Sequence, residues 1–197
     1  MFITADNSLE GLRRRALQDG KLLLTMTYRM RRGFYLLDPV VIPQSLWEGA
    51  CMLDGVERFG KAVSLSNVMA MQRKVDVMVT GATGVDCFGW LIGTGSGCFD
   101  LASGILYTAS LISDQTPSVA IVHDCQVSEE DYLPLAIGDV HCGTIITPSR
   151  TLKHENGPDT RGGIEWKDLA DEMMEDIPTL REVKSMIETG QIDQVWA

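Results

Sequence analysis

Residues 75–100 read VDVMVTGATGVDCFGWLIGTGSGCFD, and this stretch sets the expected fold. Its first six residues, Val75–Thr80, form an apolar run with three valines that is typical of a buried β-strand. A loop follows in which Gly93, Gly95 and Gly97 alternate with other residues, and residues 100–107 have a helical pattern. Such a loop lets backbone N–H groups gather around an anion, and a helix amino terminus adds positive partial charge. Taken alone, it fits a tight turn as well as a phosphate-binding loop.

Further apolar runs predict strands at residues 21–27, 118–122 and 143–146, with helical stretches between them. This alternation favours parallel βαβ units, and therefore an α/β fold with a Rossmann-like, mostly parallel sheet and helices on both faces. Ligands of such sheets collect at the carboxyl ends of the strands. The segments expected to converge on one crevice there are Thr80–Gly81, His123–Gln126 and Thr147–Arg150.

The chain length of 197 residues suits one compact domain with an appendage. We expect an α/β domain over residues 1–150, with one helix capped by Ser8 and another over residues 43–59. Residues 151–197 are expected to form a polar loop and two helices that pack on the same domain. A break at Ile177–Pro178 separates those two helices.

The composition excludes two classes of partner. The net charge of −10 repels nucleic acid and anionic membrane surfaces, and no apolar run is long enough to span a bilayer. Five cysteines, an odd number without a CxxC pair, favour free thiols in a reducing cytoplasm over a disulfide framework. We therefore expect a cytoplasmic protein whose partners are small molecules, a companion protein or a second copy of the chain.

Basic residues concentrate in the first quarter of this acidic chain. Arg13, Arg14 and Arg15 are consecutive on a predicted helix, so they fan around it instead of sharing one face. Either they are a solvated surface, or one of them reaches a ligand phosphate. Residues 28–33, YRMRRG, follow the predicted strand at residues 21–27 and add three more arginines.

Four residues, His123, Cys125, His141 and Cys142, have side chains that suit zinc, but no pair has a recognised ligand spacing. We therefore predict no protein-ligated metal. His123 and Cys125 are two positions apart and would point to the same side of an extended strand, which permits a catalytic thiol. Inert packing of a cysteine at a strand end is the simpler interpretation.

Several motifs taken in order resemble the 5-formyltetrahydrofolate cyclo-ligase family. They are VDVMVTGA, the glycine loop ending in GCFDLASGIL, VAIVHDCQV, GTIITPSRTL and GGIEWKDLADEMMEDIPTLREV. The last segment is typical of a broader, cyclo-ligase-like branch, and the resemblance runs from about Leu9 to Val183. The resemblance implies a Rossmann-like α/β fold and an activity that uses Mg-ATP and a reduced folate. In the family reaction, ATP phosphorylates the formyl oxygen of 5-formyltetrahydrofolate, and ring closure with loss of phosphate gives 5,10-methenyltetrahydrofolate.

The resemblance also assigns candidate site residues, while the catalytic residues stay unknown. Glu48 is assigned to the substrate, although a surface position on its helix is the simpler interpretation. The candidate nucleotide-binding residues are Gly93, Thr94, Gly95, Ser96, Gly97, Phe99 and Asp100. The candidate substrate-binding residues are Glu48, His123, Asp124 and Gln126.

The chain departs from the family where cations are expected. The family loop usually reads G-x-R-x-G-x-G-x-G-Y-[YF]-D, commonly with a lysine in the glycine repeat, and here Leu91, Thr94 and Cys98 replace its arginine, lysine and tyrosine. Gly138 and Gly143 replace a histidine and an aspartate of the later HD-x-x-x-D-x-I-x-TP pattern. Each lost charge-assisted contact to phosphate weakens binding by about 1.5–3 kcal/mol. The loop therefore keeps its backbone while it loses its positive side chains.

Three hypotheses follow. The first, which we favour, is a non-catalytic or diverged family member. It would be a structural or regulatory subunit, or a folate-linked binding protein in one-carbon metabolism. The second is an active, ATP- and Mg-dependent cyclo-ligase. The third is different chemistry on the same scaffold through His123, Asp124 or Cys125, since a fold does not fix a function.

Overall fold

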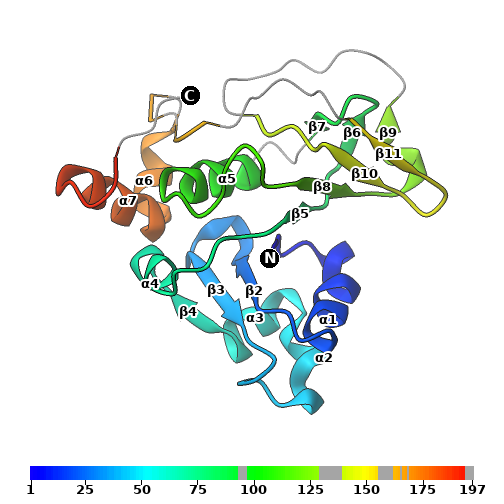
Figure 1. Cartoon of the computed structure of the whole chain (residues 1–197), viewed down its shortest axis with the longest axis horizontal. Helices are drawn as coiled ribbons and strands as arrows, with labels where there is room; N and C mark the ends of the chain where they lie inside the picture. The colour runs from blue at the N-terminus through cyan, green and yellow to red at the C-terminus, as the bar shows by residue number, and fades with distance from the viewer. Residues whose placement is uncertain (93–96, 129–138, 155–161, 165, 168, 194–197) are drawn as a thin grey trace.

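The computed structural model describes residues 1–92, 97–128, 139–154, 162–164, 166–167 and 169–193. Eight strands of this part of the chain form one sheet in the order β11-β10-β8-β5-β1-β2-β3-β4 (Figure 1). The neighbours from β10 to β2 are parallel, while the pairs β2–β3, β3–β4 and β10–β11 are antiparallel. The predicted α/β fold with a mostly parallel sheet is confirmed. The strands are β1 (Phe2–Ile3), β2 (Leu23–Met26), β3 (Phe34–Leu37), β4 (Lys61–Val63), β5 (Met78–Thr80), β8 (Ser118–Ile121), β10 (Thr144–Ile146) and β11 (Thr151–Lys153).

A second sheet of three strands lies where β5, β8 and β10 end (Figure 1). Its order is β7-β6-β9, and Val85 of β6 belongs to a small buried cluster with Val122 and Ile145. Part of the stretch between β5 and the next helix is therefore regular structure. The strands are β6 (Gly84–Asp86), β7 (Leu91–Ile92) and β9 (Val127–Ser128).

The strand β1 was not predicted, and it lies in the middle of the main sheet. The Phe2 N–H donates to the Val77 carbonyl at 2.9 Å, and the Thr4 N–H donates to the Val79 carbonyl at 3.0 Å. The strand expected over residues 21–27 is present as β2, and it is the second strand of the chain. A strand of two residues is too short for its alternation to appear in a sequence pattern.

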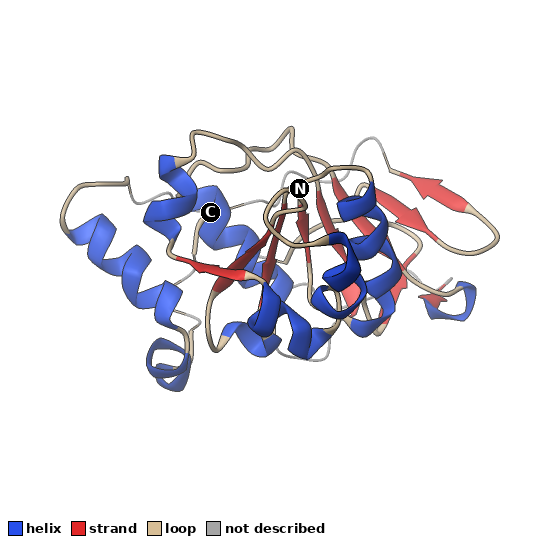
Figure 2. Cartoon of the chain, turned by 90° about the horizontal axis from the view of Figure 1, so that it is seen from below, coloured by secondary structure: helices blue, strands red, loops and turns tan. Residues whose placement is uncertain are grey.

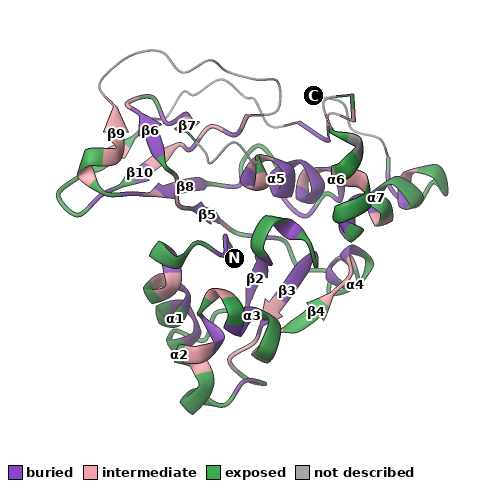
Figure 3. Ribbon diagram, turned by 180° about the vertical axis from the view of Figure 1, so that it is seen from behind, coloured by how far each residue is buried: buried purple, intermediate pink, exposed green. Residues whose placement is uncertain are grey.

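Helices cover both faces of the main sheet because successive strand residues point to opposite sides. Phe2 belongs to a core with α4, α5 and α7, while Ile3 belongs to a core with α1, α2 and α3. Figure 2 shows helices packed along the strands, and Figure 3 shows most of α5 and β2 as buried. None of the described helices has the length and apolar character needed to cross a membrane. The helices are α1 (Glu10–Gln18), α2 (Trp47–Ala50), α3 (Leu53–Phe59), α4 (Leu65–Ala70), α5 (Cys98–Thr108), α6 (Asp171–Asp176) and α7 (Pro178–Glu188).

Two expectations about the helices of the Ile3 face are wrong. Ser8 does not cap α1, because the chain enters this helix through a 3-10 turn, Asn7–Leu9, without a side-chain cap. Residues 43–59 do not form one helix, because the chain breaks at Cys51 and Met52, between α2 and α3. The break exposes the Cys51 carbonyl to the guanidinium of Arg13, which donates to it at 2.7 and 2.9 Å.

The helices α6 and α7 are separated at Ile177, as predicted, and Pro178 occupies the first turn of α7. Leu180 and Val183 of α7 are fully buried in the Phe2 core. The Glu182 carboxylate of the same helix accepts hydrogen bonds from the Leu65 N–H at 2.8 Å and the Ser66 N–H at 2.9 Å. The C-terminal helix therefore supplies a cap for the start of α4.

Replacing Glu182 with alanine is expected to lower the free energy of unfolding by about 1–2 kcal/mol, because two N–H donors at the start of α4 lose a charged acceptor. Urea unfolding followed by circular dichroism measures the change. The matched control is Glu188→Ala, an exposed residue of the same helix, for which a change of no more than about 0.5 kcal/mol is expected. Equal effects of both substitutions would contradict a capping role.

Candidate functional site

The carboxyl ends of β5, β8 and β10 lie at the same edge of the main sheet. The expected convergence on one crevice is not observed among the described residues, because the cavity that Thr80 and Gly81 line includes neither His123–Gln126 nor Thr147–Arg150. Asp124, just after β8, accepts hydrogen bonds at 2.5 Å from the hydroxyls of Thr147 and Ser149, which follow β10. The bond from Ser149, followed by the bond from Thr147, lowers the pKa of the Asp124 carboxyl. This carboxylate therefore ties two strand ends together.

Gln126 connects the same loop to the end of β5. Its side-chain N–H group donates to the Ala82 carbonyl at 2.7 Å and to the Thr83 carbonyl at 3.2 Å. Its side-chain oxygen accepts the His123 N–H at 2.6 Å. The residue therefore fixes the position of the segment Ala82–Thr83, which forms part of the wall of the cavity described next.

A cavity of about 250 Å³ opens at the carboxyl ends of β1, β2 and β5, beside the amino terminus of α5. We call it the carboxyl-edge cavity. Of the candidate nucleotide-binding residues, it brings together Gly97, Phe99 and Asp100, while positions 93–96 (Gly93, Thr94, Gly95, Ser96) lie outside the described residues. The candidate substrate residues Glu48, His123, Asp124 and Gln126 do not line it. Its walls are formed by Thr4, Asp6, Ser8, Met26, Thr80, Gly81, Ala82, Thr83, Leu91, Gly97, Cys98, Phe99 and Asp100.

The start of α5 forms one side of the carboxyl-edge cavity. Gly97 has a left-handed backbone with φ of 53°, which glycine adopts without strain, and its carbonyl accepts the Leu101 N–H at 2.8 Å. Phe99 packs against Phe2 of β1, with ring centroids 6.5 Å apart. The first turn of α5 therefore lines the cavity.

Asp100 lies in the first turn of α5 and is largely buried. Its carboxylate accepts the Val140 N–H at 2.9 Å. Burial raises the pKa of Asp100 from 3.8 to about 6, while the Val140 hydrogen bond opposes this rise and the neighbouring Asp139 adds to it. The cavity therefore contains a carboxyl group that changes its charge close to neutral pH.

Replacing Asp100 with asparagine is expected to stabilise the protein at pH 7. The raised pKa means that the folded state holds more protons than the unfolded state between about pH 4 and pH 6. The contribution of this group to stability is therefore greatest at about pH 4 and falls as the pH rises to about 6. Asparagine keeps an acceptor for Val140 and removes this cost, which is at most about 3 kcal/mol.

Unfolding of both proteins in urea at pH 4, 5, 6 and 7 measures this difference. The gain in the Asp100→Asn variant is expected to grow from about zero at pH 4 to about 1–3 kcal/mol at pH 7. A gain that does not change with pH would show that Asp100 has an ordinary pKa.

Asp6 is a site residue that the sequence did not reveal. Its carboxylate accepts the Gly81 N–H at 3.1 Å and the hydroxyl of Thr4, so it ties the end of β1 to the end of β5. The signal was absent because β1 is so short that Asp6 looked like a loop residue before a helix. A polar residue directly after Phe2–Ile3 becomes significant only once this pair is known to be a central strand.

The described residues that line the carboxyl-edge cavity include two carboxylates, Asp6 and Asp100, and no lysine, arginine or histidine. Leu91 of β7, where the resemblance to the family leads us to expect an arginine, is half-buried in the wall. Among the described lining residues, a group of phosphates placed here would face negative charge, with only backbone N–H groups and hydroxyls to neutralise it.

The three consecutive arginines of α1 do not reach this cavity. Arg13 is fully buried and donates to the carbonyls of Thr4, Asp6 and Cys51, so the expectation of a solvated surface is wrong for this residue. Arg14 and Arg15 are exposed. Arg14 pairs with Glu48 at 4.0 Å, and Arg15 pairs with Asp19 at 3.1 Å.

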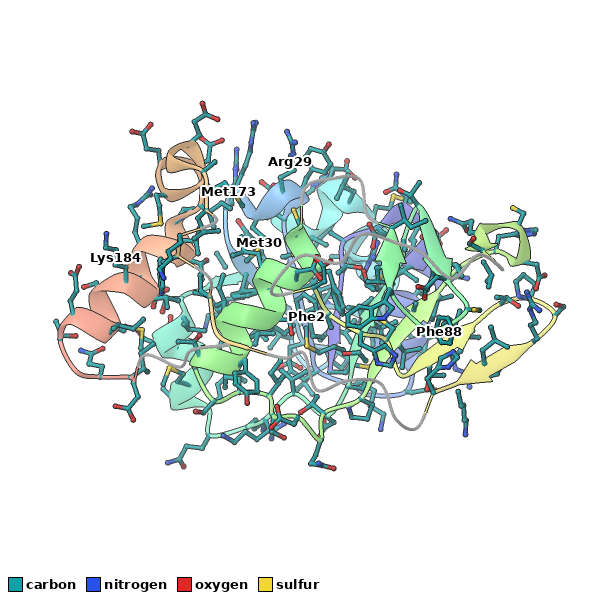
Figure 4. All side chains as sticks on the ribbon, turned by 90° about the horizontal axis from the view of Figure 1, so that it is seen from above. Phe2, Arg29, Met30, Phe88, Met173 and Lys184 are labelled. Carbon is teal, nitrogen blue, oxygen red and sulfur yellow. The ribbon has the colours of Figure 1, made fainter. Side chains whose placement is uncertain are left out.

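The basic turn after β2 lies beside the amino-terminal half of α5 (Figures 1 and 4). Arg31 pairs with Asp176 at 3.8 Å and Arg32 pairs with Glu57 at 2.8 Å. Arg29 is exposed with φ of 54°, and Met30 next to it has φ of 56° and is fully buried. The backbone conformation is uncommon for side chains of this size, and the buried Met30 anchors the turn.

The residues considered for zinc fall into two groups. His123 Nδ1 lies 3.3 Å from Cys125 Sγ on the exposed loop after β8. His141 instead bonds the Phe88 carbonyl at 2.6 Å and packs against Trp90, with ring centroids 5.3 Å apart. Within the described ranges, no group of three or more His, Cys, Asp or Glu residues is arranged to hold a metal ion. The structure brings His123 and Cys125 together, and a catalytic thiol stays a hypothesis.

Comparison with known proteins identifies a family and several relatives of this chain. The sequence model of the 5-formyltetrahydrofolate cyclo-ligase family matches residues 2–148. The chain is 31% identical over 185 residues to the methenyltetrahydrofolate synthase domain-containing protein of Homo sapiens, covering 93% of this chain and 47% of that protein. The corresponding protein of Danio rerio is 27% identical over 186 residues, covering 93% and 48%. The chain therefore spans about half the length of the curated relatives it matches.

Two solved structures are also similar. The 5,10-methenyltetrahydrofolate synthetase of Aquifex aeolicus has a TM-score of 0.48 at 18% identity, and the match covers 79% of this chain and 72% of that one. The 5,10-methenyltetrahydrofolate synthetase of Mycoplasma pneumoniae has a TM-score of 0.40 at 11% identity, covering 78% and 73%.

Proposed function

Since the chain belongs to the 5-formyltetrahydrofolate cyclo-ligase family, we propose that it is a diverged, non-catalytic member that binds a reduced folate without cyclising it. It serves one-carbon metabolism as a binding protein or as a subunit beside a companion chain or a second copy of itself. One observation carries this proposal: the only charged side chains among the described residues of the carboxyl-edge cavity are the carboxylates Asp6 and Asp100.

Phosphoryl transfer requires cations around the transferring group, because the enzyme contributes mainly charge neutralisation and positioning. The residues of this cavity do not fit the triphosphate of Mg-ATP. The Asp100 carboxyl, with a pKa of about 6, is mostly ionised at pH 7 and adds to the repulsion. The absence of two charge-assisted contacts, worth about 1.5–3 kcal/mol each, would slow such a reaction by several orders of magnitude.

The same cavity suits the flat head of a reduced folate better than it suits phosphate. Phe99, Met26 and Leu91 give it an apolar wall. Carboxylate oxygens accept hydrogen bonds from ring N–H and amino groups, of which a reduced pterin has several. Asp6 and Asp100 would therefore hold the heterocycle, and the apolar wall would cover its face.

Titration calorimetry with 5-formyltetrahydrofolate and with Mg-ATP, each added alone, tests this proposal. We expect the folate to bind and Mg-ATP to show no binding below millimolar concentration. In a parallel assay that follows formation of 5,10-methenyltetrahydrofolate, we expect no turnover above the rate without protein. The Aquifex aeolicus synthetase serves as the positive control. Turnover at an ordinary enzymatic rate would overturn the proposal.

The subunit part of the proposal has a separate test. Size-exclusion chromatography with light scattering measures the mass of the purified protein, and we expect a mass above that of one 21.7 kDa chain. If the protein is a monomer that binds folate, it can still act as a binding protein. The proposal that it acts as a subunit beside a second copy of itself would then be wrong.

The second candidate function is the active cyclo-ligase, and a specific observation favours it. Gly97 and Asp100 of the family loop are in place, and the α5 amino terminus faces the carboxyl-edge cavity. Arg29, exposed on the turn beside α5, is a candidate to replace a lost cation. If Mg-ATP does bind, Arg29→Ala is the variant that shows whether this turn supplies the charge.

A further inference from the structure

A second cavity lies at the other end of the main sheet and is larger than the first. Its volume is about 550 Å³, and it is formed where β1, β2 and β5 begin. The turn after α1 and residues 71–77, which connect α4 to β5, form its sides. Figure 1 shows this connecting segment beside the start of the chain. We call this cavity the amino-edge pocket.

The floor of the amino-edge pocket is apolar. Leu24 of β2, Val68 of α4 and Val75 contribute side chains that are between 4% and 6% exposed. Leu36 of β3 adds a half-buried side chain beside them. A ligand with an apolar body would therefore meet an apolar floor, and a volume of this size suits a small molecule.

Three basic side chains, Lys21, Arg73 and Lys74, stand on the rim of this floor, together with the Met1 ammonium and one acid, Asp76. None of the ion pairs formed by described residues involves any of the three cations. A local excess of positive charge is notable in a chain whose net charge is −10. Since these cations are not needed for pairs within the described chain, their charge is available to an anion.

Both basic segments of the rim are held by tight turns. The Lys21 N–H donates to the Ala16 carbonyl at 2.9 Å, after Gly20 with φ of 70°. Gln72, directly before Arg73, has φ of 52°, and its N–H donates to the Met69 carbonyl at 3.0 Å. The ammonium of Lys74 donates to the Ser110 carbonyl. The backbones that carry the cations are therefore fixed before any ligand arrives, which lowers the entropy lost on binding.

We propose that the amino-edge pocket binds a small amphipathic anion. Its carboxylate, sulfonate or phosphate group lies against Lys21 and Arg73, and its flat or aliphatic body lies on the floor formed by Leu24, Leu36 and Val75. The pocket is at the opposite end of the strands from the carboxyl-edge cavity, so this proposal is independent of the folate proposal. A ligand here contacts Leu24 of β2 together with Met1 and Val77, which directly precede β1 and β5, and these three strands end at the other cavity.

The probe for this site is 8-anilinonaphthalene-1-sulfonate, which carries one anionic group on an aromatic body. Calorimetry is expected to show one molecule bound per chain. The double variant Lys21→Ser/Arg73→Ser removes two exposed cations and is expected to weaken binding about tenfold or more. The control Arg14→Ser/Arg15→Ser removes the same charge from α1 and is expected to leave the affinity unchanged. Circular dichroism confirms that all variants are folded.

Two further measurements define the ligand class. Amide chemical shifts in a ¹H–¹⁵N spectrum are expected to change at Leu24 and Val75 when the probe is added. Leu36→Gln places a polar side chain in the apolar floor and is expected to weaken binding several-fold. Inorganic phosphate, which lacks an apolar body, is expected to bind at least tenfold more weakly than the probe. Shifts confined to Gly97–Asp100, an unchanged affinity in the double variant, or phosphate binding as tight as that of the probe would each overturn the proposal. So would binding to phosphatidylserine vesicles that depends on Lys21 and Arg73, because the ligand would then be a lipid surface.

Discussion

Replacing Arg13 with alanine is expected to lower the free energy of unfolding by about 3–5 kcal/mol, the largest stability effect of any single change considered. The guanidinium is fully buried and donates to the Cys51 carbonyl twice, at 2.7 and 2.9 Å. It also donates to the carbonyls of Thr4 at 2.7 Å and Asp6 at 2.9 Å. Alanine would leave these acceptors without their donors, and it would open a cavity where the side chain was.

The position of Arg13 explains why the effect should be large. It joins α1 to the end of β1 and to the break between α2 and α3, so one side chain connects three parts of the Ile3 face. Burial lowers the pKa of this guanidinium below its usual value. A planar group with several fixed N–H donors matches this set of carbonyls, and an ammonium does not. Arg13→Lys is therefore expected to lose much of the same stability.

Urea unfolding measures these changes, and Arg15→Ala is the matched control. Arg15 lies on the same helix and forms an exposed pair with Asp19 at 3.1 Å. Its loss is expected to change the free energy of unfolding by no more than about 0.5 kcal/mol. If Arg13→Ala unfolded at the same urea concentration as the control, the buried hydrogen bonds of Arg13 would be unimportant for stability.

Replacing Leu91 with arginine is expected to strengthen Mg-ATP binding by about 10- to 150-fold, because one charge-assisted contact to phosphate is worth about 1.5–3 kcal/mol. Leu91 is half-buried in the wall of the carboxyl-edge cavity, at the position where the family resemblance predicts an arginine. The new guanidinium would face the carboxylates Asp6 and Asp100 and would offset their charge. Calorimetry with Mg-ATP on the original protein and the variant measures the gain.

Leu46→Arg is the control, because Leu46 is an exposed leucine that does not line this cavity. It adds the same charge and is expected to leave Mg-ATP binding unchanged. Should both variants bind nucleotide equally, the gain would come from net charge alone. Should neither bind more tightly, the lost cation at Leu91 would not be what prevents nucleotide binding.

Strands that produce a local sequence pattern were predictable from the sequence, whereas contacts across the sheet were not. The strands β5, β8 and β10 were expected because short apolar runs bounded by turn residues are a local signal. Their meeting at Asp124 and Thr147 followed from a general rule for parallel sheets. Asp6 was missed because its significance depends on β1, whose pairing with β2 and β5 involves residues far apart in the chain.

The arginines of α1 show the same limit of prediction from sequence, because burial of a side chain depends on contacts with distant residues. Consecutive arginines predicted correctly that the three side chains would point in different directions. The sequence contained nothing to say which one was buried, because the partners of Arg13 include Cys51, 38 residues away. The break between α2 and α3, which exposes that carbonyl, was equally invisible in a segment with a continuous helical pattern.

By itself, the sequence determined the α/β class of this protein and its family, because both are recorded in the local order of its residues. Only the tertiary structure decided the charge of the two cavities. The carboxyl-edge cavity brings together Asp6 and Asp100, which are 94 positions apart in the sequence. The amino-edge pocket brings together Lys21 and Arg73, which lie on different turns. Electrostatic fields depend on distances in space, and those distances exist only after the strands have paired.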